Sequence, residues 1–443
     1  MTEPARIQPS APPAPGPAPR VCVIGAGPSG IGAAKALLAA GFEVVVYERN
    51  QEVGGNWIFT PGPSHSSVFE TTHIISSKAL SQYEDFPMPA DYPDYPGHAQ
   101  LKAYFQAYAA HFGVLPRIRF GVEVRSAAPL AGGGWELTLG DGRVERFTHL
   151  CVATGHHWKP RLPSYPGHYS GRLIHSHDFK SATPFTGQRV LVIGGGNSAC
   201  DIAVETGRVS ERTCISMRRG YWFIPKFLMG LPTDVLHARL LRKLPKAIRQ
   251  TAMKLTLRLI QGKNAAYGLP EPEHGPMEAH PTINSELLYF IRHGQIHPKP
   301  DIQRWDGKRV AFVDGTAEEF DAIIAATGFE TSYPYLPGEV GDYSGAEVPL
   351  YLKLFHPRFP DLFFIGLFQP LGCIWPLADH QGQLVARAIR GEWKRPADID
   401  SAIRREIDHP DYAFSKTPKH AVEVDYHEYR KRLRKEIAGR RAF

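Results

Sequence analysis

The sequence lacks a hydrophobic run long enough to cross a bilayer, since no stretch approaches the roughly 18 to 20 consecutive apolar residues that a spanning helix needs. Residues 1–19 are rich in proline and alanine but have no apolar core of the kind found in secretory signals. We interpret them as a disordered leader. The C-terminal residues are polar and basic rather than apolar, so we expect no transmembrane anchor there and place the protein in the cytoplasm.

Cysteine is scarce, and the five cysteines form no CxxC or CxxxxC pair. Four lie in or beside expected strands and helices, and Cys373 lies in an expected loop. This pattern favours buried free thiols in a reducing cytoplasm. We expect neither a metal site nor a redox disulfide.

The chain also lacks a large excess of charge of one sign, because it contains 51 Lys and Arg residues and 44 Asp and Glu residues, which gives a net charge of +7. Most of the basic residues are scattered, which argues against nucleic-acid binding. They are denser between Leu236 and Lys263, where eight basic positions alternate with leucines and Pro245 is expected to begin a second helix. Such a helix either caps a domain with a solvated face, the commoner case, or lies on a membrane surface.

The strongest local signal is near the N-terminus, in a chain whose 443 residues suffice for two or three globular domains. An apolar strand, Val21 to Ile24, leads into a GxGxxG loop, Gly25 to Gly30. A helix from Ala33 to Ala40 and a strand from Glu43 to Tyr47 follow, and the strand ends on Glu48. Glycines allow the tight turn, the approach of a pyrophosphate and close helix packing, and the acid can bind a ribose. This unit predicts a dinucleotide site.

A second glycine pair follows in Val53-Gly54-Gly55-Asn56-Trp57. Its backbone can pass close to a flat or anionic ligand, with the indole of Trp57 beside it. A surface turn with a core tryptophan is the alternative.

A second nucleotide unit begins with the strand Arg189 to Ile193 and the loop Gly194-Gly-Gly196-Asn197-Ser198-Ala199. After a helix through Asp201 and Glu205, the next strand, Arg212 to Met217, ends on Arg218-Arg219 rather than on an acid. An acid at this position favours a free ribose 2′-hydroxyl, whereas an arginine favours a 2′-phosphate. The first unit therefore suits FAD or NAD and the second suits NADPH, with a basic surface turn as the alternative.

Other features organise the chain around these units. The phrase Ala-Thr-Gly ends an apolar strand at Ala153 and again at Ala326, and we interpret both as crossover points between domains. Near the C-terminus, Asp379-His-Gln381 is expected to open a helix to Arg390 whose N-terminus could face a flavin ring. From Trp393 onward a helical, solvated tail is expected.

Between the crossovers stands Tyr169-Ser-Gly171-Arg-Leu-Ile-His175-Ser-His-Asp-Phe179-Lys180. It resembles the fingerprint FxGxxxHxxx(Y/F)K of the flavin-containing monooxygenases, with Tyr in place of the first Phe. Together with the glycine motifs, Ala326-Thr-Gly-Phe329 and Gln369-Pro-Leu-Gly372, the resemblance extends over about residues 20 to 392. The related Baeyer–Villiger enzymes have Trp-Pro where this chain has Phe179-Lys180.

The resemblance implies an α/β fold with two Rossmann-like dinucleotide-binding domains, the NADPH domain being inserted into a discontinuous FAD domain. The FAD domain would comprise residues 20–165 and 330–443, and the NADPH domain residues 166–329. The implied FAD-binding residues are Gly25, Gly27, Pro28, Ser29, Gly30, Glu48, Gly55, Asn56, Trp57, Ser76 and Gln381. Those implied for NADPH binding and domain coupling are Tyr169, Gly171, His175, Gly194, Gly196, Asn197, Ser198, Arg218 and Arg219.

The implied reaction starts with hydride transfer from NADPH to FAD, after which dioxygen forms a flavin C4a-hydroperoxide that oxygenates nitrogen or sulfur in a small substrate. Baeyer–Villiger oxygenation of ketones and an uncoupled NADPH oxidase remain as alternatives, while a homodimer stays open. A flavin disulfide reductase would need a cysteine pair that this chain lacks. A non-catalytic flavin sensor would not need the second nucleotide motif.

One departure from the family concerns the segment S-N-(S/T)-S-K, whose asparagine amide contacts the flavin and the nicotinamide in family members. Here the segment reads His73-Ile-Ile75-Ser76-Ser-Lys78, which puts Ile75 in the place of the asparagine. Isoleucine cannot form a side-chain hydrogen bond. Either Ser76, His73 or a distant residue substitutes, or the peroxide leaks. Ile75, Ser76, His73 and Gln369 are the candidates for positions near the flavin.

Overall fold

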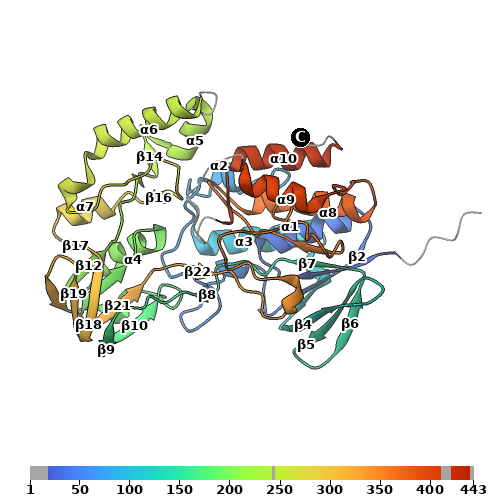
Figure 1. Cartoon of the computed structure of the whole chain (residues 1–443), viewed down its shortest axis with the longest axis horizontal. Coiled ribbons are helices and arrows are strands. Elements are labelled where there is room, and N and C mark those ends of the chain that lie inside the picture. Colours follow the sequence, from blue (N-terminus) through green and yellow to red (C-terminus); the bar gives the residue numbers. More distant parts are fainter. Residues whose placement is uncertain (1–17, 242–244, 411–420, 440–443) are drawn as a thin grey trace, which may run out of the picture.

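The computed structural model describes residues 18–241, 245–410 and 421–439, which form two lobes side by side (Figure 1). Nearly all of the expected disordered leader lies outside the described residues. Within the described ranges, no helix combines the length and the apolar composition needed to span a membrane.

The first lobe is built on a five-stranded parallel sheet with strand order β23-β7-β1-β2-β3. Its strands are β1 (Arg20–Ile24), β2 (Glu43–Glu48), β3 (Ile118–Phe120), β7 (His149–Val152) and β23 (Leu362–Phe364). Apolar residues run almost continuously along the central strands, because both faces of a parallel sheet are buried. Side chains of β1 alternate between two core clusters, with Val21 and Val23 in one and Cys22 and Ile24 in the other.

Helices cover one face of this sheet. They are α1 (Pro28–Ala39), α3 (His98–His111) and α8 (Trp375–Ile389), with the short α2 (Lys78–Ser81) beside them. The axes of α1 and α8 come very close, since a Cβ on Gly382 would lie 2.6 Å from the Cα of Ala33. On the other face lies an antiparallel sheet of β4 (Val124–Pro129), β5 (Trp135–Leu139) and β6 (Val144–Phe147), which contributes Trp135 and Leu137 to the core.

Two expectations for the C-terminal part need correction. The helix to Arg390 begins at Trp375, not at Asp379, because Pro376 is suited to a first helical turn. The tail contains α9 (Ile399–Asp408) and α10 (Tyr426–Ile437), but it is not simply solvated. Leu433 is fully buried, and α10 packs on α8 (Figure 1).

The second lobe contains another five-stranded parallel sheet, in the order β10-β21-β11-β12-β17. Its strands are β10 (Arg172–His175), β11 (Arg189–Ile193), β12 (Arg212–Ser216), β17 (Ile296–Lys299) and β21 (Ala322–Ala325). The helices α4 (Asn197–Gly207) and α7 (Leu287–Arg292) pack on it. A smaller sheet consists of β9 (Gly167–Tyr169), β18 (Ile302–Gly307), β19 (Arg309–Phe312) and β20 (Ala317–Glu319). The expected α/β fold with two Rossmann-like units is confirmed.

The chain passes between the lobes along two short strands, β8 (Lys159–Pro160) and β22 (Phe329–Glu330), which pair antiparallel with each other (Figure 1). An ion pair between Lys159 and Glu330, 2.8 Å apart, joins them. The two chain segments that connect the lobes are therefore adjacent.

A long excursion of the second lobe lies between β12 and α7. It contains α5 (Thr233–Leu236), a π-helical turn (His237–Leu241) and α6 (Lys246–Gln261), whose N-cap is Pro245 as expected. Its short strands are β13 (Phe223–Ile224), β14 (Phe227–Leu228), β15 (Leu231–Pro232) and β16 (Thr282–Ile283). In the first lobe, β24 (Gln369–Pro370) pairs with β25 (Glu423–Val424).

Candidate functional site

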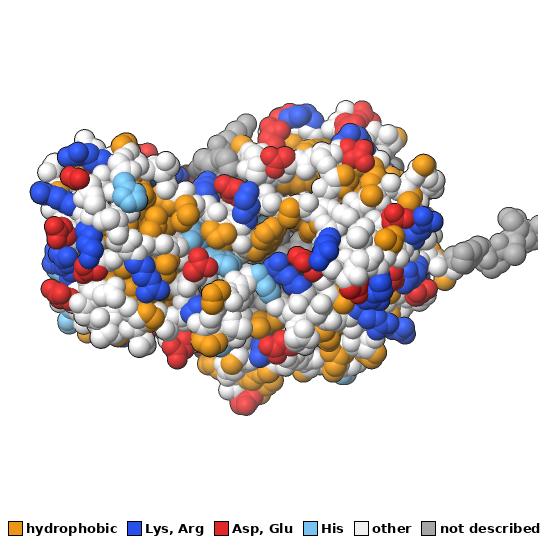
Figure 2. All heavy atoms as spheres, turned by 90° about the horizontal axis from the view of Figure 1, so that it is seen from below, with side chains coloured by type: hydrophobic (Ala, Val, Ile, Leu, Met, Phe, Trp, Pro, Cys, Tyr) orange, Lys and Arg blue, Asp and Glu red, His pale blue; other side chains and the backbone are white. Residues whose placement is uncertain are grey.

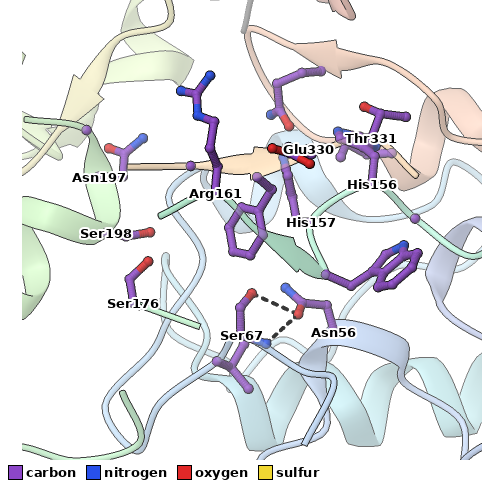
Figure 3. A pocket seen from close by; sticks show the side chains of 18 of the residues that line it. Asn56, Ser67, His156, His157, Arg161, Ser176, Asn197, Ser198, Glu330 and Thr331 are labelled. Atoms are coloured by element: carbon purple, nitrogen blue, oxygen red, sulfur yellow. Dashed lines mark hydrogen bonds between the residues drawn. The ribbon is translucent and has the colours of Figure 1, made fainter. Parts of the chain in front are cut away.

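A cavity of about 1100 Å³ lies between the lobes and is lined by both glycine-rich loops. Hydrophobic and histidine side chains gather in the middle of the face shown in Figure 2, between the two lobes. In Figure 3, Asn197 and Ser198 approach the cavity from the second lobe, and Asn56 and Ser67 from the first. The two motifs that the sequence singled out thus share one space.

The first loop is held against a backbone carbonyl. Gly25 has a φ of +105°, and a Cβ there would lie 2.6 Å from the carbonyl oxygen of Ala153. A Cβ on Gly30 would lie 1.9 Å from the carbonyl oxygen of Gly25. Only glycine fits at these two positions, and the resulting turn directs the N-terminus of α1, with Pro28 in its first turn, at the cavity.

Glu48 is fixed by the backbone. Its side chain is buried, and its two carboxylate oxygens accept hydrogen bonds from the backbone nitrogens of Ala26 (2.7 Å) and Asn50 (2.8 Å). The acid at the end of β2 is therefore oriented toward the cavity by the glycine loop itself. Its remaining lone pairs can accept hydrogen bonds from ribose hydroxyls.

Gly55, Asn56 and Trp57 form a short 3₁₀ turn that packs on the first loop. A Cβ on Gly55 would lie 2.8 Å from the Cα of Gly27, so two backbones meet here. The Oδ1 of Asn56 accepts hydrogen bonds from the backbone nitrogen (2.7 Å) and the hydroxyl (2.9 Å) of Ser67 (Figure 3). All three residues and Ser29 line the cavity.

His73, Ile75 and Ser76 also line the cavity, but their polar atoms are engaged elsewhere. The Ser76 hydroxyl is buried and bonded to the Ser81 hydroxyl at 2.8 Å. His73 is exposed, with Nδ1 3.0 Å from the carbonyl oxygen of Thr71 and Nε2 in contact with the Lys226 ammonium. Both side chains therefore have hydrogen-bond partners within the protein.

The N-terminus of α8 faces the cavity through Ile374 and Trp375, and Gln369 lines the same wall. Gln381 lies deeper. It is fully buried away from the cavity lining, its Oε1 accepts a hydrogen bond from the backbone nitrogen of Gly366, and its Nε2 donates to Tyr429. It supports the Gly366 turn instead of opening a helix toward a ligand.

The second loop repeats the construction of the first. A Cβ on Gly194, where φ is +132°, would lie 2.5 Å from the carbonyl oxygen of Ala326. Each glycine loop thus rests on the backbone carbonyl of the alanine in its own Ala-Thr-Gly turn. Gly196 has open space around it, and Asn197 is held by a hydrogen bond from the backbone nitrogen of Ile283 to its Oδ1 (2.7 Å).

Arg218 and Arg219 follow β12 and line the cavity beside this loop. Arg218 is exposed, and Arg219 donates to the hydroxyl of Tyr221 at 3.4 Å. Among the described residues, neither arginine forms an ion pair. Both guanidinium groups can therefore receive an anionic partner.

Besides Gln381, four residues of the sequence prediction lie away from the cavity lining: Gly30, Tyr169, Gly171 and His175. Tyr169 is bonded to the backbone oxygen of Phe320, and a Cβ on Gly171 would lie 2.4 Å from the Tyr169 hydroxyl oxygen. Burial lowers the pKa of His175 to about 4, so this ring is neutral against Phe329. The motif's Lys180 donates to the carbonyl oxygen of Ser66 (2.5 Å) and so joins the lobes.

The sequence analysis missed His156, His157 and Arg161, which follow the first Ala-Thr-Gly turn and line the cavity (Figure 3). His156 is buried, and the loss of solvation holds its pKa well below the usual value. Arg161 donates to the carbonyl oxygen of Thr327 at 3.0 Å, on the returning linker. The sequence signal that could have identified these three residues is their position directly after the recurring Ala-Thr-Gly turn.

These observations test whether the site fits two dinucleotides. Each loop lacks the Cβ atoms that would fill the space beside its helix N-terminus, and each is followed by a residue suited to a ribose, Glu48 or Arg218. Unpaired backbone N–H groups at a helix N-terminus bind phosphate. The residues fit one dinucleotide in each lobe, with the two facing a common cavity.

Comparisons with known proteins agree with this geometry. The family model described as flavin-binding monooxygenase-like matches residues 18–442. Dimethylaniline monooxygenase [N-oxide-forming] 2 of Rattus norvegicus is 31% identical over 96% of this chain and 83% of its own length.

Two solved structures share the fold. S-allyl-L-cysteine S-oxygenase from Allium sativum superposes with a TM-score of 0.72 at 22% identity, covering 95% of this chain and 88% of that one. A complex of OTEMO with FAD and NADP gives a TM-score of 0.72 at 18% identity, covering 96% of this chain and 98% of that one.

Proposed function

Because the chain belongs to the flavin-binding monooxygenase-like family, and is an enzyme that uses FAD and NADPH, we propose that it oxygenates sulfur or nitrogen in small organic substrates. NADPH, a proton, dioxygen and the substrate would give NADP⁺, water and an S-oxide or N-oxide. The observation that carries the proposal is the shared cavity, which is lined by both glycine-rich loops, by Glu48 at the end of β2 and by Arg218 after β12. FAD, when bound, supplies the oxygen-activating chemistry, and NADPH supplies the electrons.

We assign FAD to the lobe formed by residues 20–165 and 330–443. Gly25, Gly27 and Gly30 would leave room for the pyrophosphate, and the α1 N-terminus would face its charge. Glu48 would hold a ribose, while Gly55, Asn56 and Trp57 would flank the cofactor's path toward the α8 N-terminus. Gln381 acts as a positioning residue, since it holds the Gly366 turn that lines the cavity.

We assign NADPH to residues 166–329. Gly194, Gly196, Asn197 and Ser198 would surround the pyrophosphate, and Arg218 with Arg219 would pair with the 2′-phosphate. Tyr169, Gly171 and His175 would act by fixing the lobe. Their segment ends at Lys180, which is bonded to the first lobe.

Ile75 bears on the outcome of the reaction. The polar atoms of Ser76 and His73 are engaged, so this wall of the cavity offers little hydrogen bonding near the proposed flavin position. This favours a partly uncoupled enzyme that releases hydrogen peroxide. It also leaves oxygen insertion into ketones as a second candidate.

A product balance tests the proposal. Purified holoenzyme is given NADPH and oxygen with a thioether, a tertiary amine or a cyclic ketone, and product and hydrogen peroxide are measured per NADPH. We expect S-oxide or N-oxide with a fraction of peroxide. Ester or lactone alone would establish the ketone activity, and peroxide alone with every substrate would refute the monooxygenase proposal.

We place the enzyme in the cytoplasm, which is supported by five buried free thiols. A homodimer is an assembly that light scattering of the holoenzyme can test.

A further inference from the structure

The second lobe carries an exposed apolar stripe on α6. Ile248, Leu255 and Leu259 are 54%, 65% and 89% exposed. Their spacing of seven and four residues places them on one side of a helix. The opposite side is buried, since Met253 and Leu257 pack with Trp222 and Ile224 in a small core cluster. The helix is therefore anchored on one face and bare on the other.

Apolar exposure is concentrated in this part of the molecule. Seven of the twelve large hydrophobic side chains that are exposed in the described residues lie between positions 227 and 260. They include Met229, 90% exposed at the tip of the hairpin formed by β14 and β15. Scattered single residues would need no explanation, but a stripe on one helix does.

Positive charge predominates in the sequence around the stripe, although Glu271 and Glu278 contact α6 through Arg258 and Gln250. Residues 235–270 contain eight Lys and Arg and no Asp or Glu, and since the whole chain has a net charge of +7, the remainder has a net charge of −1. Lys254 and Lys263 on or next to α6 are exposed. Arg258 is paired with Glu271 at 2.5 Å and lies over Trp222, so it is partly committed to the fold.

We propose that α6 lies on the surface of an anionic lipid bilayer, with Ile248, Leu255 and Leu259 inserted among the acyl chains and the lysines near the headgroups. An apolar face bordered by basic residues is the composition of helices that bind at the bilayer interface. A second copy of this chain fits less well, because a symmetric contact would bring two faces of the same positive charge together. In Figure 1, α6 lies at the outer edge of its lobe, where a flat surface can reach it.

The test is cosedimentation of the FAD-loaded enzyme with extruded vesicles, followed by flavin absorbance. We expect binding to phosphatidylcholine vesicles with equal phosphatidylglycerol, and at least about tenfold weaker binding to phosphatidylcholine alone, since each interfacial Lys or Arg contributes about fivefold. Raising the salt to about 1 M should release the enzyme, because the screening length falls to about 3 Å. Equal binding to both vesicle types, or none, would overturn the proposal.

Substitutions test whether vesicle binding depends on the α6 stripe or on nonspecific hydrophobic adsorption. Leu255→Ser with Leu259→Ser should weaken vesicle binding about tenfold or more. The matched control, Val144→Ser with Val313→Ser, removes two side chains of 55% and 58% exposure elsewhere and should bind like the parent. Lys254→Gln with Lys263→Gln should weaken binding, and Lys394→Gln with Lys435→Gln, also exposed, should not.

Each variant should keep its FAD and its NADPH oxidation rate without vesicles, because none of these residues lines the cavity. If the leucine variant instead converts a dimer to a monomer in light scattering and binds vesicles like the parent, the stripe is a contact between copies and the bilayer proposal fails.

Discussion

The two nucleotide-binding units begin alike and end differently. In both, a glycine with positive φ rests on the carbonyl of an alanine that directly follows a neighbouring strand, and a helix N-terminus faces the cavity. After the second strand, however, the first unit places a buried Glu48 with both oxygens engaged by backbone nitrogens. The second places an exposed Arg218 that forms no ion pair with the described residues. From this difference we expect the first site to retain its ligand and the second to exchange it.

The two units should differ most in their response to a substitution at the third small residue of the glycine-rich loop, which is Gly30 in the first unit and Ala199 in the second. Gly30→Ala puts a Cβ 1.9 Å from a carbonyl oxygen of the same loop, whereas the second unit already has Ala199 there. We expect purified Gly30→Ala to retain essentially no FAD, measured as flavin absorbance per protein. Gly196→Ala is the control. It has room within the protein, so it should keep FAD and raise only the KM for NADPH.

Glu48→Gln tests whether the first site depends on the fixed carboxylate. The amide has one acceptor oxygen instead of two, so one of the backbone nitrogens of Ala26 and Asn50 loses its partner. We expect the FAD dissociation constant to rise roughly ten- to hundredfold, as for an unsatisfied buried donor. Titration of the apoenzyme with FAD measures it, and an unchanged constant would show that the carboxylate is not a ribose ligand.

Arg218→Ala tests the second site. The guanidinium is exposed and screened, so we expect a rise of roughly tenfold in the KM for NADPH, with little change for NADH, which has no 2′-phosphate. Arg304→Ala, at an exposed position in the same lobe, serves as the control. An equal loss for both nucleotides would contradict the assignment.

The smallest effect is expected at the boundary between the two sites. Ile75→Asn adds a hydrogen-bonding amide to a wall whose neighbouring polar groups are engaged. We expect the fraction of NADPH electrons recovered as hydrogen peroxide to fall about threefold, the size of one neutral hydrogen bond. Ile75→Leu should leave this fraction unchanged. If Asn changes nothing either, another group already protects the reaction.

Local patterns predicted much of this architecture. The strand Arg189–Ile193 was predicted with its observed bounds, and β1, β2 and β12 within one residue at each end. The first helix was harder. It begins at Pro28 rather than at Ala33, because glycines that weaken a helix in isolation here permit its contact with the Gly25 carbonyl.

Contacts between distant residues could not be read from the sequence. The Asp234 carboxylate in α5 accepts a hydrogen bond from the backbone nitrogen of Ser77 at 2.7 Å, across 157 positions. Likewise, Gln381 was expected at the cofactor because of its place in the chain, but helix packing turned it toward Tyr429. Such outcomes depend on tertiary packing, which no local motif encodes.

The order of strands in the first sheet bears on how the chain is made. Strand β23 pairs with β7 but is synthesised about 210 residues after it, and α8, which covers α1, is synthesised later still. During translation the second lobe is complete while the first still lacks an edge strand and a covering helix. Since domains fold as units during synthesis, we expect the second lobe to fold first and FAD to bind only after β23 and α8 have been synthesised.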